Sequence, residues 1–284
     1  MLEVKQISPP MIDNVLRFLS SKEETSQFLI NNLKEHGPAL SDHPNSGNYK
    51  ALVENKTSIR GVFCLNKRGN LLAQIDCLYN PNSIIEECLK EKFEVKGFIG
   101  DWDTIDPLFR SYKERNPSFK ATYNSKEILY RYVFQESEQV LRKNDHVRFL
   151  ESNDFNQWHP LNLAYRKELN IPSDLTEQQN KDLFISRTKN KCWWGYFEKR
   201  NLISIAALNS TGETIGQVGG VFTIKGKRKQ GYSKATVLHL LRDCRDMHRH
   251  SKSILFTGET DIPAQKLYES IGYEKIGYYA LILS

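Results

Sequence analysis

The sequence predicts a mixed α/β (α+β) protein made of two successive halves of similar design. Short apolar runs typical of strands alternate with longer periodic runs typical of helices, in a similar order in both halves of the 284-residue chain. Residues 98–105 (FIGDWDTI) also resemble residues 256–263 (FTGETDIP). Together, the element order and this match indicate two copies of one fold. The polar stretch 135–145 is the expected linker between them.

The first half predicts alternating strands and helices. An apolar stripe at Phe28, Leu29 and Leu33 indicates a helix, which the sequence His-Gly-Pro at 36–38 ends. The polar turn 66–70 (NKRGN) joins two apolar runs in the manner of a hairpin. The expected strands are 49–54, 59–65, 71–78, 95–99 and 128–134, and the further expected helices run from 80 to about 91 and onward from 103.

The second half predicts more strands and three helical regions. The first helical region runs from 154 to about 187, and we expect Pro160 and the sequence Ile-Pro-Ser at 171–173 to interrupt it. The second follows a basic loop and reaches about residue 250, and Asp261 caps the third. The expected strands are 147–150, 193–198, 203–209, 216–224, 254–257, 275–276 and 278–283.

The composition is that of a globular protein, with 39% hydrophobic and 26% charged residues, including 14 Phe and 13 Tyr. No apolar run approaches the roughly 18 residues that a membrane-spanning helix needs. The five cysteines are odd in number and scattered, without a C-x-x-C pair. This pattern favours reduced thiols in a cytoplasmic protein over a disulfide framework or a zinc site. We therefore expect no membrane association and no metal.

The positive charge is concentrated in the second half. The net charge is +6; residues 1–140 contain 18 Lys+Arg against 19 Asp+Glu, or −1, which leaves +7 for the rest. Such an excess is typical of binding to nucleic acid, to an anionic surface or to a small polyphosphate ligand, and it is also typical of a solvated loop. Within ten residues the chain has five basic side chains and no acid: Lys225, Lys227, Arg228, Lys229 and Lys234.

The same segment has the layout of an anion site. The strand 216–224 runs through a glycine turn into a helix, whose first turn has free N–H groups and the positive end of the dipole. Gly231 lets a phosphate approach the backbone, and Ser233 is small and adds a hydroxyl donor. Arg228 and Lys234 supply charge. An ordinary basic connection is the alternative, because the Gly-Lys-Ser/Thr of the nucleotide P-loop is absent.

These residues resemble the signature of the GNAT superfamily of N-acyltransferases. Arg228-x-x-Gly231-x-Ser233 matches R/Q-x-x-G-x-G/A, with serine in the last place, and residues 220–223 look like the family's central strand. Residues 267–273 (LYESIGY) are similar to its L-Y-x-x-x-G-F segment. Two departures stand out: Asp261 replaces the usual asparagine of N-x-x-A, and the usual proline before the loop is absent.

The resemblance implies a GNAT domain at residues 145–284 and, from the parallel element order, a degenerate GNAT-like copy at residues 1–138, as in tandem-GNAT proteins. Each domain is then expected to be a mixed, mostly antiparallel sheet flanked by helices. In the first copy, the matching loop at 78–83 has neither glycine nor a basic residue. We therefore expect only the second copy to bind a cosubstrate.

The reaction that the resemblance implies is transfer of an acyl group, most often acetyl, from acyl-CoA to an amine. The thioester is already activated, so placing a neutral amine beside its carbonyl does much of the work. The remaining tasks are to take a proton from the ammonium and to give one to the leaving thiolate. The resemblance assigns the acyl-CoA contacts to Val221, Phe222, Thr223, Arg228, Lys229, Gln230, Gly231, Tyr232, Ser233, Lys234, Asp261 and Ala264.

The catalytic residues expected are Tyr268 and Glu168. Tyr268 matches the family tyrosine whose hydroxyl faces the CoA sulfur, so it is the expected general acid. Glu168 falls in the region that lines the acceptor site in the family, so it is the first candidate for the base, ahead of Glu198 and Glu213. Each of these acids is also interpretable as a solvated surface residue.

Two other functions compete with the enzyme. One is a non-catalytic CoA-binding regulatory or scaffold protein. The presence of Tyr268 favours the enzyme over this alternative. The other is a nucleic-acid binder, which would spread basic and aromatic residues over a surface instead of gathering them at one loop. We expect a small-molecule or peptide amine as acceptor and no nucleic acid; the sequence leaves the acceptor's identity and the oligomeric state open.

Overall fold

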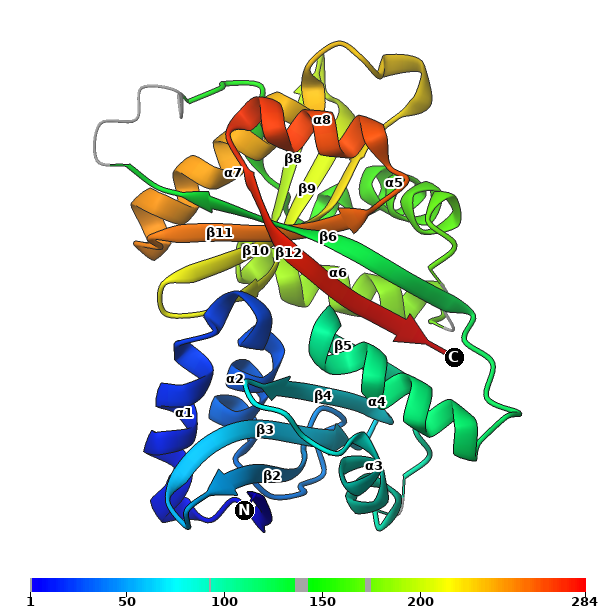
Figure 1. The fold of residues 1–284 in the computed structure, drawn as a ribbon. Coiled ribbons are helices and arrows are strands. Elements are labelled where there is room, and N and C mark those ends of the chain that lie inside the picture. The colour runs from blue at the N-terminus through cyan, green and yellow to red at the C-terminus, as the bar shows by residue number, and fades with distance from the viewer. Residues whose placement is uncertain (1, 92, 136–142, 172–174) are drawn as a thin grey trace. The chain divides into compact units, whose positions relative to one another are not determined.

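The computed structural model describes residues 2–91, 93–135, 143–171 and 175–284, so most of the expected linker lies outside the described residues. The chain forms two compact units, Met1–Ile128 with Gly277–Ser284 (unit 1) and Leu129–Ile276 (unit 2). The elements of both are labelled in Figure 1.

Unit 1 is a sheet with helices on both faces. Its strands lie in the order β1-β2-β3-β4-β5, and the end of β12 follows β5. The pairs are antiparallel except for β4 and β5, which run parallel and are joined through α3. The elements are β1 (Leu2–Gln6), α1 (Ile12–Ser20), α2 (Glu23–His36), β2 (Gly47–Glu54), β3 (Ser58–Asn66), β4 (Asn70–Ile75), α3 (Pro81–Leu89), β5 (Gly97–Asp101) and α4 (Trp102–Arg115).

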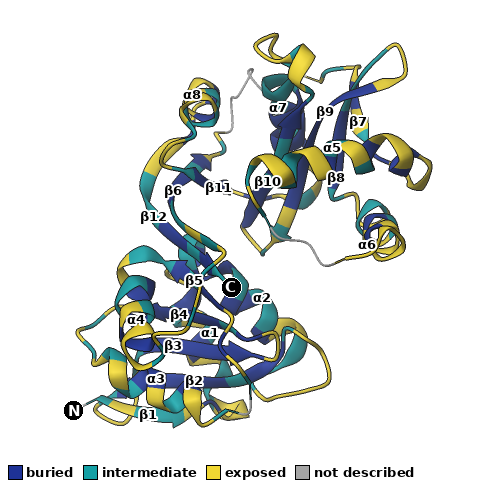
Figure 2. Cartoon of the chain, turned by 90° about the vertical axis from the view of Figure 1, so that its right-hand side faces the viewer, coloured by how far each residue is buried: buried dark blue, intermediate teal, exposed yellow. Residues whose placement is uncertain are grey.

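Both faces of this sheet are buried, as the dark strands of Figure 2 show. Along β2, Ala51 and Val53 pack in a core with α1 and α2, whereas Leu52 packs in a second core with α3 and α4. Successive strand residues point to opposite faces, so two helix layers require an almost continuous apolar run. The central strands of unit 1 therefore appear in the sequence as continuous apolar runs, in which apolar and polar residues do not alternate.

Unit 2 repeats this design. Its strands lie in the order β6-β11-β10-β9-β8-β7, with β10 parallel to β11 through α7 and antiparallel to β9. The predicted fold class, two domains with mixed, mostly antiparallel sheets flanked by helices, is confirmed. The elements are β6 (Tyr123–Val133), β7 (Val147–Phe149), α5 (Phe155–Glu168), α6 (Glu177–Lys189), β8 (Trp193–Glu198), β9 (Asn201–Thr211), β10 (Ile215–Thr223), the 3-10 turn η3 (Lys225–Lys227), α7 (Tyr232–His248), β11 (Lys252–Gly258), α8 (Ile262–Ile271) and β12 (Glu274–Leu283).

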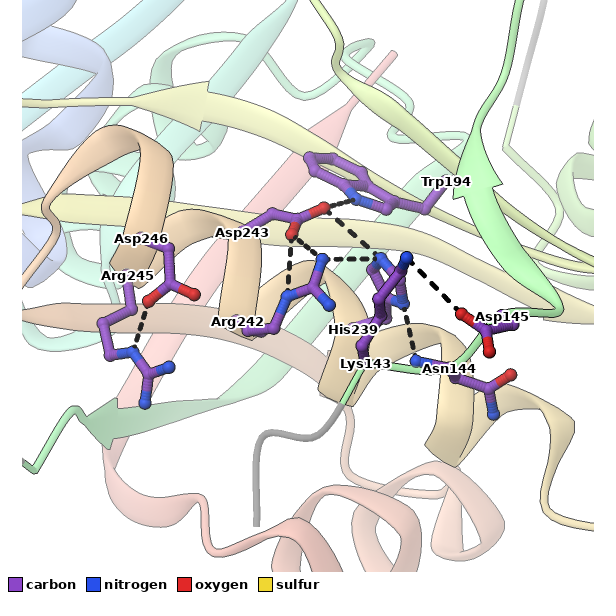
Figure 3. A network of polar contacts seen from close by, with 9 residues as sticks. All are labelled: Lys143, Asn144, Asp145, Trp194, His239, Arg242, Asp243, Arg245 and Asp246. Atoms are coloured by element: carbon purple, nitrogen blue, oxygen red, sulfur yellow. Dashed lines mark hydrogen bonds and ion pairs between the residues drawn. The ribbon is translucent and has the colours of Figure 1, made fainter. Parts of the chain in front are cut away.

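Two adjacent tryptophans of β8 show how the layers of unit 2 are built. Trp193 packs edge-on against Trp158 of α5, with ring centroids 5.2 Å apart. Trp194 points to the other face, where its indole Nε1 donates to Asp243 of α7 at 2.9 Å. Figure 3 shows this carboxylate between Trp194, Arg242 and His239. Burial lowers the pKa of His239, which favours its neutral form.

Two local expectations were wrong. Pro160 does not interrupt the helix, because α5 runs from Phe155 to Glu168 through it. Proline removes one internal hydrogen bond there, and the burial of Phe155 and Trp158 offsets that loss. The strand expected at 71–78 ends earlier, at Ile75, and Leu78 is almost fully exposed.

The C-terminal strand is divided between the units. Its residues Tyr279–Leu283 pair antiparallel with β5, within unit 1. The grouping of the chain therefore differs from the expected division at 1–138 and 145–284, which assigned the whole C-terminus to the second domain. The pairing is made by residues about 180 positions apart, and local sequence patterns do not encode such a contact.

Candidate functional site

The centre of the site is the second half of β10. Strand β10 pairs with β11 only over Ile215–Gln217. Farther along, the register between β10 and β9 shifts between Gly219 and Phe222, and Gly220 takes a left-handed backbone with φ +59°. A Cβ at Gly220 would lie 3.1 Å from the Trp193 ring, so a larger residue would be both strained and crowded there. Beyond Gln217, the edge of β10 that faces β11 therefore has backbone N–H and C=O groups without a strand partner. A ligand with amide groups can form hydrogen bonds with such an edge.

Hydroxyl groups connect the end of β10 to the helix that follows. The Oγ1 of Thr223 donates to Ser204 Oγ at 2.8 Å and lies 2.6 Å from Ser233 Oγ. Ser204 Oγ in turn donates to the Phe222 carbonyl at 3.0 Å. Thr223 and Ser233, both predicted to contact the cosubstrate, are thus held beside each other at the point where the strand becomes a loop.

The N-terminus of α7 is open to an anion. Gly231 is its N-cap residue, with φ +85°, and it has no side chain to accept the free N–H groups of the first turn. No heavy atom lies within 4 Å of the position a Cβ would occupy on it. The 17-residue helix also directs the positive end of its dipole there. A phosphate is the chemical group that this combination suits best.

The corresponding loop of unit 1 is built differently. Helix α3 is capped by Asn80, whose side-chain oxygen accepts from the Asn82 N–H at 3.0 Å. An amide oxygen therefore occupies one of the donors that a phosphate would use. The segment 78–83 thus has no glycine and no basic residue, and the N-terminus of the helix that follows is capped by its own side chain.

Arg228 and Glu168, which were predicted for separate roles, are bound to each other. The guanidinium Nη1 and Nη2 donate to the two carboxylate oxygens of Glu168, each at 2.7 Å, and Nε donates to the Thr223 carbonyl at 3.0 Å. This hydrogen bonding lowers the pKa of Glu168. An ion-paired carboxylate is a weak proton acceptor, so the geometry favours a positioning role for Glu168.

Replacing Glu168 with glutamine is therefore expected to keep turnover within roughly threefold of the wild type, since a partly exposed ion pair contributes about 1 kcal/mol or less. The pH profile of kcat decides between the roles. An unchanged acid limb with a small rise in KM for acyl-CoA supports positioning of Arg228. A fall of a hundredfold or more with loss of the acid limb would establish Glu168 as the base.

The other candidate bases and loop residues lie as follows. Glu198 accepts from the Tyr232 hydroxyl at 2.9 Å and also pairs with Lys227, and the bond with Lys227 most strongly lowers its pKa. Glu213 precedes β10 and lies a strand's length from Thr223. Lys229 and Gln230 are exposed in the loop before α7. No described carboxylate at the loop is left without a basic partner.

Helix α8 is tied to the start of α7. Lys234 Nζ donates to the Ser270 carbonyl at 2.9 Å. At the other end of α8, Asp261 accepts from the Ala264 N–H at 3.1 Å, so the residue that departs from the family pattern serves as a helix cap. Contact of Asp261 and Ala264 with a cosubstrate stays a prediction.

Tyr268 lies in a cluster of tyrosines. It is 7% exposed, and its ring centroid lies 6.4 Å from that of Tyr130 and 5.9 Å from that of Tyr273. The Tyr130 hydroxyl donates to Glu269 at 2.9 Å, and burial together with this bond raises its pKa to about 12. The Tyr273 hydroxyl is bonded with Ser253 at 2.8 Å. These ring contacts fix the position of Tyr268. It lies two residues before Ser270, whose carbonyl accepts the hydrogen bond from Lys234.

A cavity of about 230 Å³ lies beside the bulge of β10. Gly220 forms part of its wall, and the rest comes from α5, α6, β8 and the chain around them. No local pattern in the sequence predicts this cavity, because its walls come from residues between 158 and 220 that only the fold brings together. Among the described residues, no group of His, Cys, Asp and Glu could hold a metal ion, and no helix is long and apolar enough to cross a membrane.

Comparisons with known proteins agree with this geometry. Residues 155–273 match the model of the acetyltransferase (GNAT) family. A GNAT-family acetyltransferase from Colwellia psychrerythraea has the same fold, with 16% identity, 99% of both chains covered and a TM-score of 0.55. A GCN5-related N-acetyltransferase from Sphaerobacter thermophilus, at 10% identity, covers 100% of this chain and 95% of its own with a TM-score of 0.60.

A two-domain relative is also similar in structure. It is a tandem GNAT protein from the clavulanic acid biosynthesis pathway, with 9% identity, 100% of this chain and 98% of that chain covered, and a TM-score of 0.51. No curated protein matches the chain in sequence. At these identities the solved structures show the fold, and the family model adds the sequence pattern. The chain therefore carries a domain of the GNAT acetyltransferase family at residues 155–273.

Proposed function

We propose that the protein is an acyl-CoA-dependent N-acyltransferase, most simply an N-acetyltransferase, acting on a small-molecule or peptide amine. One observation carries the proposal: the unpaired edge of β10 ends beside the uncapped N-terminus of α7, where Thr223 contacts Ser233. A pantetheine arm has amide groups that suit the first, and a pyrophosphate has the charge that suits the second. The GNAT family model on the same residues supports this pairing.

The residues proposed to hold the cosubstrate follow from these two features. Backbone groups of Val221, Phe222 and Thr223 lie along the β10 edge. The N–H groups of the first turn of α7 meet the phosphates, helped by basic side chains of the loop. The loop residues in this role are Arg228, Lys229, Gln230, Gly231, Tyr232, Ser233 and Lys234, with Asp261 and Ala264 at the start of α8.

For the chemistry, the cosubstrate supplies a thioester whose carbonyl is open to attack by a neutral amine. The N–H groups of β10 are suited to polarise that carbonyl, and Tyr268 is proposed to donate its hydroxyl proton to the leaving thiolate. The proton that the attacking nitrogen loses goes to solvent water, which restores the Tyr268 hydroxyl. No metal enters this scheme. A cytoplasmic location is proposed on the five free cysteines, which stay reduced there.

Two alternatives have less support. A nucleic-acid binder would spread its basic groups over a surface, but here they are gathered at one loop, at Lys225, Lys227, Arg228, Lys229 and Lys234. A non-catalytic CoA-binding protein would share the loop and differ in having no use for the Tyr268 hydroxyl.

Calorimetric titration with CoA tests the proposal. We expect one site per chain, because only α7 of the two candidate helices has an uncapped N-terminus, while Asn80 caps α3. Release of free thiol from acetyl-CoA on addition of amines then tests transfer. Two sites per chain, or none, would contradict the assignment of the loop.

A further inference from the structure

We propose that the cavity beside the β10 bulge binds an acceptor that carries a carboxylate and a flat apolar group as well as its amine, which is the chemical class of a free apolar α-amino acid. The inference rests on the proposed function for the amine's reaction and deepens it by naming the acceptor class. It is carried by the charge of the cavity wall and by the aromatic rings that line the cavity.

The cavity is small and lined with aromatic rings. Its volume of about 230 Å³ is below the roughly 300–1,000 Å³ of pockets for drug-sized ligands, so it suits a molecule of few atoms. Rings of Trp158, Tyr165, Phe184 and Trp193 line it, and Phe184 stacks on Trp158 with centroids 4.5 Å apart. Flat aromatic walls favour a flat or branched apolar group in the ligand.

Two indole nitrogens in this wall have no hydrogen-bond partner. The Nε1 atoms of Trp158 and Trp193 are both buried and unpaired, and the two residues are only 4% and 6% exposed. Buried tryptophan N–H groups normally donate to an acceptor, and a buried donor without a hydrogen bond costs about 1–3 kcal/mol of stability. By contrast, the neighbouring Trp194 donates to Asp243. The wall of this cavity is thus rich in N–H donors, and it has no acidic acceptor among its described residues.

The charge of the wall selects an anion. Arg166 and Arg187 both line the cavity, and none of the described lining residues is acidic. Arg187 donates to the Leu208 carbonyl at 2.9 Å and lies over the Trp193 ring at 5.4 Å, contacts that leave its charge unneutralised. Burial lowers the pKa of both guanidinium groups. Elsewhere in unit 2, Arg148 and Arg228 each hold a carboxylate. A planar carboxylate is the group that fits a guanidinium best.

The position of the cavity brings such a ligand to the expected reaction centre. Gly220 in its wall directly precedes Val221–Thr223, and the ring of Tyr165 lies 6.3 Å from that of Phe222. A carboxylate at the arginines leaves the amine free to face β10. Positive surroundings also lower the pKa of a bound ammonium, which favours the neutral nucleophile. This reduces the need for a free carboxylate base, and Glu168 and Glu198 are both ion-paired.

Matched ligands test the carboxylate on the full-length protein. Calorimetry compares L-phenylalanine with L-phenylalanine amide, in which a neutral carboxamide replaces the carboxylate, and makes the same comparison for leucine and leucine amide. A further ligand, 3-phenylpropanoate, has no amine and reports the carboxylate site without any reaction. We expect both acids and 3-phenylpropanoate to bind, and the amides to bind about 10- to 100-fold more weakly, as the loss of charged hydrogen bonds predicts.

Variants test the arginines with charge-matched controls on the same helices. Arg187→Gln is expected to weaken binding of 3-phenylpropanoate about 10- to 100-fold, while Lys189→Gln, two residues away and exposed, leaves it unchanged. Arg166→Gln repeats the comparison, with the exposed Lys167→Gln as control. An unchanged CoA affinity shows that each variant is folded; if Arg187→Gln does not fold, Arg166→Gln decides.

The outcomes separate this inference from the proposed function. Equal binding of acids and amides, or no binding of any probe, overturns the inference. Thiol release that is equally fast with acids and amides overturns it too, while the proposed function stands. Carboxylate-dependent binding with no thiol release from acetyl-CoA upholds the anion site and counts against N-acetyltransferase activity.

Discussion

Turnover is expected to fall about 10²- to 10⁴-fold when Tyr268 is replaced by phenylalanine, with the affinity for acyl-CoA nearly unchanged. The substitution removes only the hydroxyl, and the neighbouring rings of Tyr130 and Tyr273 still hold the phenyl ring in place. The ordinary pKa of tyrosine, about 10, is close to the roughly 8.5 of a thiol, so a phenol is a reasonable donor to a leaving thiolate. Single-turnover thiol release measures the chemical step directly.

Tyr130→Phe is the matched control for this experiment. Tyr130 belongs to the same cluster and is also buried, but its hydroxyl donates to Glu269. We expect Tyr130→Phe to lower stability by about 1 kcal/mol through the lost hydrogen bond and to keep the rate of the chemical step. If Tyr268→Phe also keeps that rate, Tyr268 is a packing residue and the thiolate takes its proton from water.

CoA binding is expected to fall at least a hundredfold when Gly231 is replaced by valine. The backbone there is left-handed, at φ +85°, which costs a β-branched residue about 1–3 kcal/mol. The new side chain also fills space that contains no protein atom within 4 Å and that the proposal assigns to phosphate. Calorimetry with CoA gives the affinity, and a thermal melt separates loss of binding from loss of folding.

Gly226 provides the control in the same loop. A Cβ at Gly226 also meets nothing within 4 Å, but this glycine has no left-handed backbone and lies before Arg228. We expect Gly226→Val to bind CoA within a few-fold of the wild type. Gly231→Asn separates strain from obstruction, because asparagine tolerates the left-handed region and still blocks a phosphate. Wild-type affinity in Gly231→Val would place the phosphates elsewhere.

Features encoded within a few residues could be predicted from the sequence. The loop from Arg228 to Lys234 does precede a helix that begins at Tyr232, and Asp261 does cap α8. Turns, caps and helix starts depend on neighbouring residues, so their signals are local. The two-domain fold also followed, because a repeated order of elements is visible without knowing any contact.

Contacts between distant residues could not be predicted in this way. Glu168 looked like a free acid, but it meets Arg228, 60 residues later, and a pairing of that range leaves no trace in either neighbourhood. Both Trp193 and Trp194 are buried because helices cover both faces of β8, whereas an expectation from alternation alone leaves one of them exposed. The cavity has the same origin, since α5, α6, β8 and β10 each supply only part of its wall.

The division of β12 between the units also bears on how the two halves of this chain are inherited. Residues Tyr279–Leu283 complete the sheet next to β5, so a version of the gene that lost its first half would leave these residues without their neighbour strand, and one that lost the second half would expose the edge of β5. An exposed edge is a template for aggregation. The last residues of the chain therefore cover the edge of β5, a structural task that does not depend on whether the first half binds a ligand.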